Sequence, residues 1–193
     1  MDYFFEIAIV LILIVLNGIF SMSEFALVSS RKTRLRKRAE DGDQGAATAL
    51  RLTDDLTPFL STIQIGMTLV GIFTGAFGEA TIARGLEVYF REIPSLARYS
   101  NALSIILVVL LITYLTLIFG ELVPKRLALN KAESIATRVA KPMYFLSILV
   151  KPLIFVLSYS TDAVLQLMRV KKTREPPVTE EEIKIMLEEG TKA

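Results

Sequence analysis

The stretch that decides the fold is "LSIILVVLLITYLTLIFGELVPKR", residues Leu103–Arg126. No charged residue occurs from Leu103 to Gly120, and a helix that spans a bilayer needs about 20 mostly apolar residues. Directly after this run come Glu121 and, three residues later, Pro124. The stretch therefore predicts a membrane-spanning helix that ends with a carboxylate and a proline.

The composition of the whole chain is typical of an integral membrane protein. Hydrophobic residues make up 52% of the 193 residues, the mean hydropathy is +0.50, and apolar blocks alternate with short charged ones. The chain contains no Cys and no His, so zinc and other metals that prefer nitrogen or sulfur lack their usual ligands. Any metal bound here is expected to be a hard ion with oxygen ligands.

Three segments are predicted to span the membrane: about 4–28, 59–77 and 102–123. The first is too long for a signal peptide and has no basic leader. A fourth apolar stretch, 143–168, contains Lys151 and Pro152 near its middle. Because proline removes a helical hydrogen bond, we expect a broken helix there.

Positive charge predicts the topology. Six basic residues occur between Arg31 and Arg38, and more follow the third span and residue 168. Short loops rich in Lys and Arg stay in the cytoplasm. We therefore expect a multi-pass protein of the inner or plasma membrane, with the N-terminus and the 79–100 connection outside and the C-terminus in the cytoplasm.

The predicted fold class is an all-α integral membrane protein with three transmembrane helices per subunit and cytoplasmic helical segments. Because both flanks of 143–168 are basic, a broken juxtamembrane or re-entrant helix is expected, as a belt over about 132–168. The alternative is a fourth true span. Residues 1–175 are expected to form the membrane domain, and 176–193 to begin a cytoplasmic linker helix within a longer protein.

Pro124 predicts a cation ligand one helical turn before it. Proline has no N–H, so the carbonyl of Gly120, which that N–H would have bonded, is left free beside the carboxylate of Glu121. Hard cations take such oxygens, and broken helices in transporters bind ions in this way. The alternative is an ordinary helix end in which Glu121 pairs with Lys125.

Polar stripes are also predicted on the other two spans. On the first, Asn17, Ser21 and Glu24 share one helical face, with Ser23 one step round. The alternative for Ser and Asn residues is packing between helices. The second span has Gln64 and Thr68 as candidate pore lining, and Gly71 and Gly75 as a close-packing face.

The acidic ends of the first and third spans are expected to lie at a similar depth, because both spans run in the same direction. Two carboxylates in a low-dielectric site repel each other unless a positive charge lies between them. Glu24 and Glu121 could therefore converge on one divalent cation.

Three stretches resemble the transmembrane domain of the CorC/cyclin M (CNNM) family: "LNGIFSMSEFALVSSRKTRL", "STIQIGMTLVGIFTGAFGE" and "FGELVPKRLAL". The resemblance covers roughly residues 1–175. It implies a homodimer in the lipid bilayer, with three transmembrane helices per subunit, a belt helix, and a pair of cytoplasmic CBS domains downstream. It also implies Mg²⁺ export coupled to Na⁺ entry. Many relatives carry Asn where this chain has Met67.

Matched motif by motif, the resemblance assigns the metal-binding residues Ser21, Ser23, Glu24, Gly120 and Glu121. The ion it implies is Mg²⁺, and Na⁺ is the further candidate. Mn²⁺ and Ca²⁺ also accept oxygen ligands, so the residues alone leave the choice of ion open.

Two function classes fit these features. The favoured one is a secondary transporter that exports Mg²⁺, and the alternative is a Mg²⁺-sensing membrane anchor that regulates a partner without transport. An enzyme is not expected, because the chain has no His, no Cys and no nucleophile–base pair. Nucleic-acid binding is not expected either, because a basic run directly after a membrane helix is explained by orientation and anionic lipid.

Overall fold

The computed structural model describes residues 3–168, and every regular element in this range is a helix. Four helical runs are long and apolar enough to cross a membrane: Phe4–Ser29, Leu56–Arg91, Ala97–Asn130 and Ala132–Leu167. The expected all-α membrane fold is confirmed at this level, whereas the count of three spans stays a prediction. The helix expected within 176–193 lies outside the described residues.

The first membrane helix leads into a helical hairpin. Helix α1, Tyr3–Ser29, is apolar on nearly all sides, and all of its backbone groups can bond internally, as lipid requires. The hairpin consists of the basic helix α2 (Lys32–Glu40) and of α3 (Gln44–Asp54). A tight turn joins them, in which Gly42 has a φ of 95°. Asp43 caps α3 by accepting two backbone N–H groups of its first turn.

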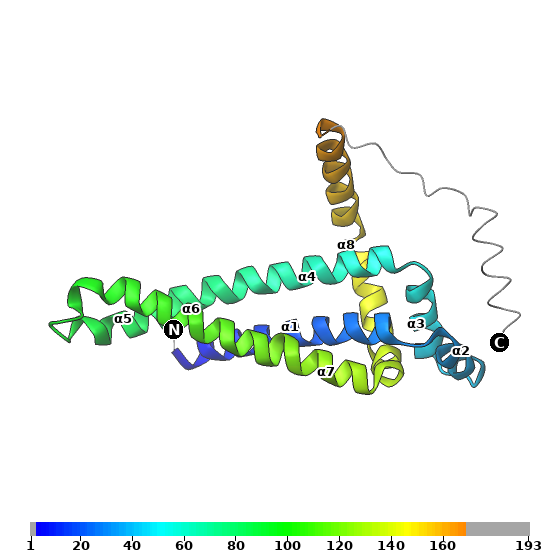
Figure 1. The fold of residues 1–193 in the computed structure, drawn as a ribbon, viewed down its shortest axis with the longest axis horizontal. Helices are drawn as coiled ribbons and strands as arrows, with labels where there is room; N and C mark the ends of the chain where they lie inside the picture. Colours follow the sequence, from blue (N-terminus) through cyan, green and yellow to red (C-terminus); the bar gives the residue numbers. More distant parts are fainter. Residues whose placement is uncertain (1–2, 169–193) are drawn as a thin grey trace, which may run out of the picture. The chain divides into compact units, whose positions relative to one another are not determined.

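Two antiparallel helical runs complete the bundle, and each contains a π-helical segment (Figure 1). The first consists of α4 (Leu56–Phe77), η1 (Gly78–Ala83) and α5 (Arg84–Arg91). The second follows the 3-10 turn η2 (Ala97–Tyr99) and consists of α6 (Ser100–Leu117), η3 (Ile118–Leu122) and α7 (Val123–Asn130). Because α5 joins them, the end of α4 and the start of α6 lie at the same end of the bundle.

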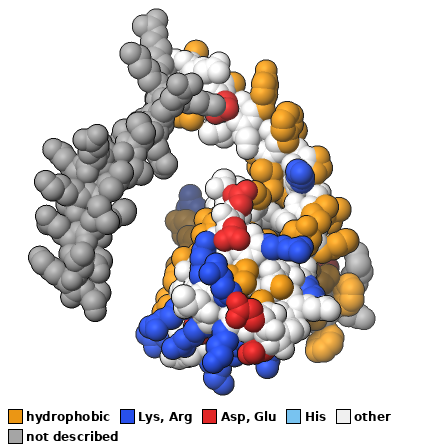
Figure 2. Space-filling model, turned by 90° about the vertical axis from the view of Figure 1, so that its right-hand side faces the viewer, with side chains coloured by type: hydrophobic (Ala, Val, Ile, Leu, Met, Phe, Trp, Pro, Cys, Tyr) orange, Lys and Arg blue, Asp and Glu red, His pale blue; other side chains and the backbone are white. Residues whose placement is uncertain are grey.

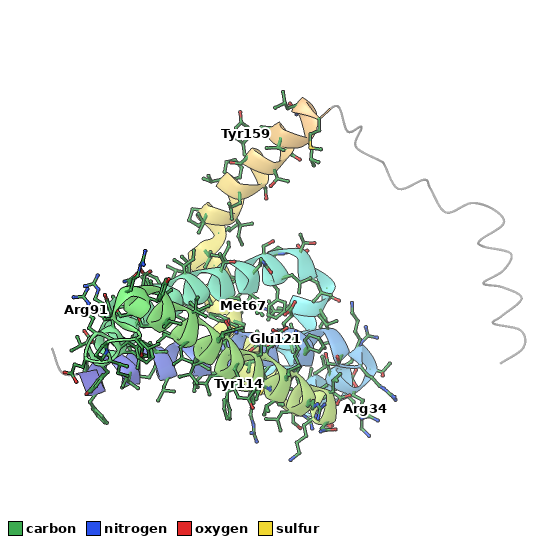
Figure 3. All side chains as sticks on the ribbon, turned by 60° about the vertical axis from the view of Figure 1, so that its left-hand side comes forward. Arg34, Met67, Arg91, Tyr114, Glu121 and Tyr159 are labelled. Carbon is green, nitrogen blue, oxygen red and sulfur yellow. The ribbon has the colours of Figure 1, made fainter. Side chains whose placement is uncertain are left out.

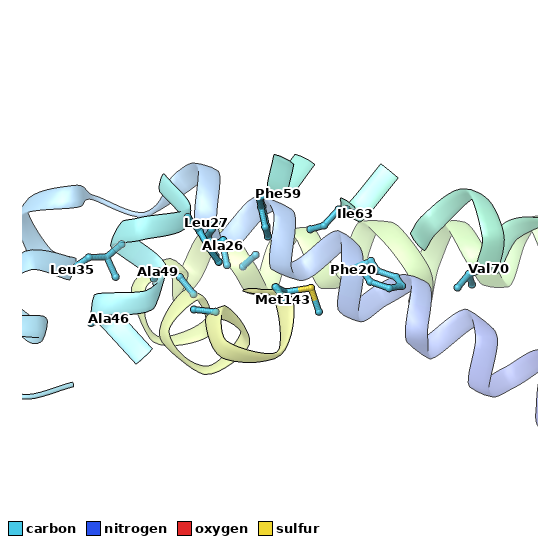
Figure 4. Close-up of a cluster of buried hydrophobic side chains, with 14 residues drawn as sticks. Phe20, Ala26, Leu27, Leu35, Ala46, Ala49, Phe59, Ile63, Val70 and Met143 are labelled. Carbon is cyan, nitrogen blue, oxygen red and sulfur yellow. The ribbon is translucent and has the colours of Figure 1, made fainter. Parts of the chain in front are cut away.

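The core lies where α1, α4 and the beginning of α8 (Ala132–Leu167) meet (Figure 4). Phe59 and Ile63 of α4 are almost completely buried, and Phe20 of α1 lies against α4 at Gly66, where any side chain would clash with the ring. From α8, a stripe of buried alanines ends at Met143. Burial of these side chains orients α4, and so determines which of its polar residues face the inside.

Basic side chains gather at the end of the molecule that carries α2 and α3 (Figure 2). Leu35 is fully buried and holds α2 against the core, while the charged side chains of α2 remain largely exposed. Two of them bridge to other elements, Lys32 to Asp54 at 3.1 Å and Arg34 to Glu133 at 3.4 Å. Exposed pairs of this kind contribute little stability.

Helix α8 corrects the expectation of a broken helix at Lys151 and Pro152. It runs without interruption for 36 residues, with Pro142 and Pro152 both inside it. Each proline removes one hydrogen bond from a long ladder, and apolar flanks support a helix through such a site. The expected break at Pro152 is therefore not observed, whereas the re-entrant form stays a prediction. The position of α8 along or across a membrane also stays a prediction.

The end of α8, from Phe155, belongs to a second unit separate from residues 1–154. Within the described part of this unit, residues 155–168, most side chains are exposed, including the large apolar side chains of Phe155 and Tyr159. All site geometry below lies within the first unit.

Candidate functional site

Two glycines let α1 approach η3 and α7 closely. A Cβ atom on Gly18 would lie 2.7 Å from the carbonyl oxygen of Phe119 and 3.1 Å from the ring of Pro124. On the opposite side, a Cβ atom on Gly120 would lie 3.1 Å from the side-chain nitrogen of Asn17. This contact brings the first and third predicted motifs together, as their shared direction led us to expect.

The carbonyl of Gly120 has a partner on α1. Asn17 Nδ2 donates a buried hydrogen bond to this oxygen over 3.1 Å. Pro124 cannot bond it, and in η3 the pattern has lengthened to five residues, since the N–H of Val123 bonds the carbonyl of Ile118. From the sequence we expected the Gly120 carbonyl to be free, and we treated Asn17 only as polar lining. The sequence could not identify Asn17 as the donor, because the donor to a freed carbonyl comes from a neighbouring helix.

The two serines of α1 differ in their hydrogen bonds. Both are completely buried. Ser23 Oγ donates to the carbonyl of Ile19 at 2.6 Å, whereas Ser21 Oγ has no partner among the described residues. Leaving a buried hydroxyl unpaired costs about 1–3 kcal/mol. An oxygen in this state fits a cation ligand, because an ion supplies the missing interaction.

The two acids are half-buried and are in different states. Glu121, labelled in Figure 3, pairs with Lys125 one turn later, as the alternative interpretation of this motif required. The Lys125 ammonium also lies 4.8 Å from the centre of the Phe25 ring. Glu24, next to Phe25 in the chain, makes no hydrogen bond or ion pair within residues 3–168.

No group of three or more Asp, Glu, His or Cys side chains in the described part of the chain could hold a metal ion. A cation at this junction would therefore depend on serine and backbone oxygens together with one or both acids. That donor set is the one predicted from the sequence: Ser21, Ser23, Glu24, Gly120 and Glu121.

The second span contributes differently from what was expected. Gln64 and Thr68 are exposed, and the Thr68 hydroxyl only bonds the carbonyl of Gln64. Packing of Phe59 and Ile63 turns this face of α4 away from the interior. Met67 packs against the hydrophobic core rather than presenting an oxygen (Figure 3). The structure therefore brings neither Gln64 nor Thr68 to the site.

A cavity of about 460 Å³, called here the central cavity, lies between α1, α4, η1 and α6. Most of its lining is apolar, and its polar members are Asn17, Thr74, Glu79, Thr113 and Thr116. Thr116 Oγ1 is buried and has no hydrogen-bond partner among the described residues. Sequence reasoning missed Thr74, Glu79 and Thr116, although each occurs in an otherwise apolar run.

The predicted close-packing glycines also line the central cavity. A Cβ atom on Gly71 or Gly75 would have no atom within 4 Å. These glycines therefore pack against nothing in the described protomer, and their expected role in a dimer stays a prediction.

A helical bundle with four membrane-capable runs and a buried polar contact between two of them is typical of a multi-pass membrane protein. Residues 8–193 match the cyclin M transmembrane N-terminal domain, and the chain belongs to this family. The suspected relationship to CorC and cyclin M proteins is thereby confirmed.

Several curated proteins are similar over nearly the whole chain. The UPF0053 protein sll0260 of Synechocystis is 50% identical over 188 residues, which cover 97% of this chain and 42% of that protein. The UPF0053 protein YhdP of Bacillus subtilis is 32% identical over 190 residues, 97% of this chain and 43% of that protein. The polyamine export protein of Salmonella typhimurium is 30% identical over 188 residues, 97% of this chain and 42% of that protein. The chain thus spans about two fifths of the length of these relatives.

Proposed function

We propose that this chain is the membrane domain of a secondary transporter that exports Mg²⁺ across the plasma membrane, coupled to Na⁺ entry. One observation carries the proposal: the buried Asn17–Gly120 contact joins the serine stripe of α1 to the Glu121 motif of η3. The proposal is further supported by a buried hydroxyl on α1, Ser21 Oγ, that has no hydrogen-bond partner among the described residues, and by half-buried acids on both joined elements, Glu24 and Glu121.

The donor set suits Mg²⁺ as cargo. Mg²⁺ requires near-octahedral oxygen ligands at about 2.0–2.1 Å and keeps part of its water shell. Serine hydroxyls, the Gly120 carbonyl and one carboxylate supply such oxygens, with water completing the set. Binding would require Glu121 to exchange Lys125 for the ion, so the lysine acts as an internal competitor.

The orientation belongs to the same proposal. With the basic α2 face in the cytoplasm, Glu24 and Glu121 lie toward the cytoplasmic side, from which an exported ion is loaded. The full-length transporter is proposed to be a homodimer with CBS domains after this chain, as the family resemblance implies.

Polyamines are a second candidate cargo, because two relatives are named polyamine export proteins. A polyamine carries ammonium groups separated by methylene segments. The central cavity offers a mostly apolar lining with one carboxylate, Glu79, which is chemically complementary to such a molecule.

Flux through proteoliposomes tests the proposal. The chain is reconstituted with Mg²⁺ on one side, and a Na⁺ gradient is imposed and then reversed. The proposal expects Mg²⁺ flux that changes direction with the gradient and is lost in Glu121→Gln. The matched control is Glu87→Gln, which alters an acid already paired with Arg91.

Other outcomes identify the alternatives. Spermidine or putrescine flux without Mg²⁺ flux would replace Mg²⁺ with a polyamine as cargo. Mg²⁺ binding by calorimetry without any flux would support the sensing anchor. Wild-type flux in Glu121→Gln would place the transport site elsewhere.

A further inference from the structure

The tripeptide Phe-Gly-Glu occurs twice, and both copies lie at a π-helical segment. Phe77–Glu79 begins η1 at the end of α4, and Phe119–Glu121 lies within η3 at the end of α6. Since α4 and α6 are antiparallel, the copies lie toward opposite ends of the bundle (Figure 1). π-Helical segments are rare and frequently mark functional sites.

The glycine of each copy lies against a neighbouring helix. A Cβ atom on Gly78 would lie 2.2 Å from the side chain of Ile112, and one on Gly120 would lie 3.1 Å from Asn17. Both glycines are buried. In each copy, the glycine allows close helix packing directly beside the following glutamate.

The two glutamates differ in their counter-charge. Glu121 has Lys125 four residues later and pairs with it. The corresponding position after Glu79 is Ala83, and Glu79 makes no hydrogen bond or ion pair within residues 3–168. Among the described residues, Glu79 is thus the copy whose carboxylate has no ion-pair partner.

Glu79 lies where two cavities meet. It lines the central cavity, and it also lines an adjoining cavity of about 280 Å³ together with Arg84, Glu87 and Asn101. Both cavities share Ile105, near the start of α6, whereas the central cavity extends along α6 to Leu117. At 1.5 Å per residue, this stretch of α6 is about 18 Å long. A path lined by Glu79 at one end therefore reaches the Asn17–Gly120 junction at the other.

We propose that Glu79 is a second cation-binding carboxylate, which takes a small hard cation at the end of the bundle remote from α2. The cavity supplies a neutral oxygen near Glu79, since Thr74 lines it from the end of α4. The inference rests on the proposed function in one respect, that the chain moves cations. It adds a site on the other side of the Asn17–Gly120 contact from Glu24 and Ser21.

A single-cysteine reporter tests this site in the reconstituted chain, which contains no native cysteine. Ile105 lines the same two cavities as Glu79, and its side chain is half-buried. In Ile105→Cys, modification by a cationic methanethiosulfonate reagent is timed in Mg²⁺ alone, in Na⁺ alone, and in choline at equal ionic strength. At about three times its dissociation constant, a protecting cation slows the reaction about fourfold.

The expected result is protection by Mg²⁺ or Na⁺ with Glu79 present and no protection in Glu79→Gln. Glu92→Gln in the same background is the matched control and should keep protection, because Glu92 is exposed and lines neither cavity. Glu79→Asp, which keeps the charge, should be protected at higher cation concentration. The Glu79→Asp variant also tests the proposal if Glu79→Gln fails to fold.

Equal protection in Glu79→Gln and wild type, or no protection by either cation in wild type, would overturn the proposal. The variant Glu121→Gln separates failure of the Glu79 site from failure of the proposed function. If protection at residue 105 persists while Mg²⁺ flux is absent from every variant, the transport proposal fails and the Glu79 site stands. If Mg²⁺ flux is present and protection is absent, the Glu79 site fails and the transport proposal stands.

Discussion

The side-chain amide of Asn17 donates a hydrogen bond to the backbone carbonyl of Gly120, 3.1 Å away and 103 residues later in the chain. The bond joins α1 to a π-helical segment whose usual donor position is occupied by Pro124. Asn17 of α1 thereby supplies the hydrogen bond that Pro124 cannot donate to the Gly120 carbonyl of η3. Several tests follow from this geometry.

Asn17→Leu should destabilise the protein by about 1–3 kcal/mol, because it leaves the buried Gly120 carbonyl without its amide donor. Urea unfolding in detergent, followed by circular dichroism, measures the loss. Asn101→Leu is the control, since its amide makes only an exposed contact of 3.4 Å with Glu87. Equal stability of the two variants would show that the Asn17 bond contributes nothing.

Gly18→Ala and Gly71→Ala should change stability in opposite directions. Alanine favours a helix over glycine by up to about 1 kcal/mol, so Gly71→Ala, where the new methyl group meets nothing within 4 Å, should stabilise. At Gly18 the methyl group would lie 2.7 Å from the Phe119 carbonyl, and overpacking of this kind costs about 1–3 kcal/mol. Thermal unfolding of the two variants compares them, and a stabilised Gly18→Ala would disprove the close approach of α1 and η3.

Lys125→Gln should strengthen Mg²⁺ binding if Glu121 is a ligand. The lysine competes with the ion for this carboxylate, and a partly exposed pair contributes up to about 1 kcal/mol, which corresponds to roughly fivefold in affinity. Glu121→Gln should abolish binding while the helical content is unchanged. Calorimetry measures both variants, and wild-type affinity in Glu121→Gln would exclude this residue as a ligand.

Gly71→Leu and Gly75→Leu are predicted to disrupt a homodimer. Each leucine would extend from a position with open space around its Cβ, so the folded protomer should tolerate it. Light scattering in detergent reports the assembly state, and circular dichroism controls for folding. Dimers of unchanged stability in both variants would place the interface elsewhere.

Cysteine labelling on intact cells should determine the topology of α8. With three spans, Arg98→Cys reacts with an impermeant maleimide from outside, whereas Arg36→Cys and Met168→Cys react only after permeabilisation. Labelling of Met168→Cys from outside would instead show that α8 crosses the membrane as a fourth span.

The helical architecture could be predicted from the sequence because a membrane leaves few alternatives. An apolar run such as 102–123 has to form a helix, since lipid offers no partner for an unpaired backbone group. The same local logic identified the motifs at Glu24 and Glu121, where a carboxylate interrupts an apolar segment.

The contacts between these motifs depended on tertiary structure. Apolar residues occur on all sides of α4, so periodicity could not show that Phe59 and Ile63 face inward while Gln64 and Thr68 face outward. That rotation is decided by packing of α4 against α1. The same packing leaves Glu79 beside a cavity.

Helix α8 shows the same division between local and tertiary information. Pro152 predicted a break, yet a long apolar helix tolerates the loss of one hydrogen bond, so the local signal was outweighed by the rest of the ladder. At Pro124 the local signal did identify the released carbonyl of Gly120. Its partner Asn17 became evident only in the folded bundle, because hydrogen bonds between helices are made by residues far apart in the chain.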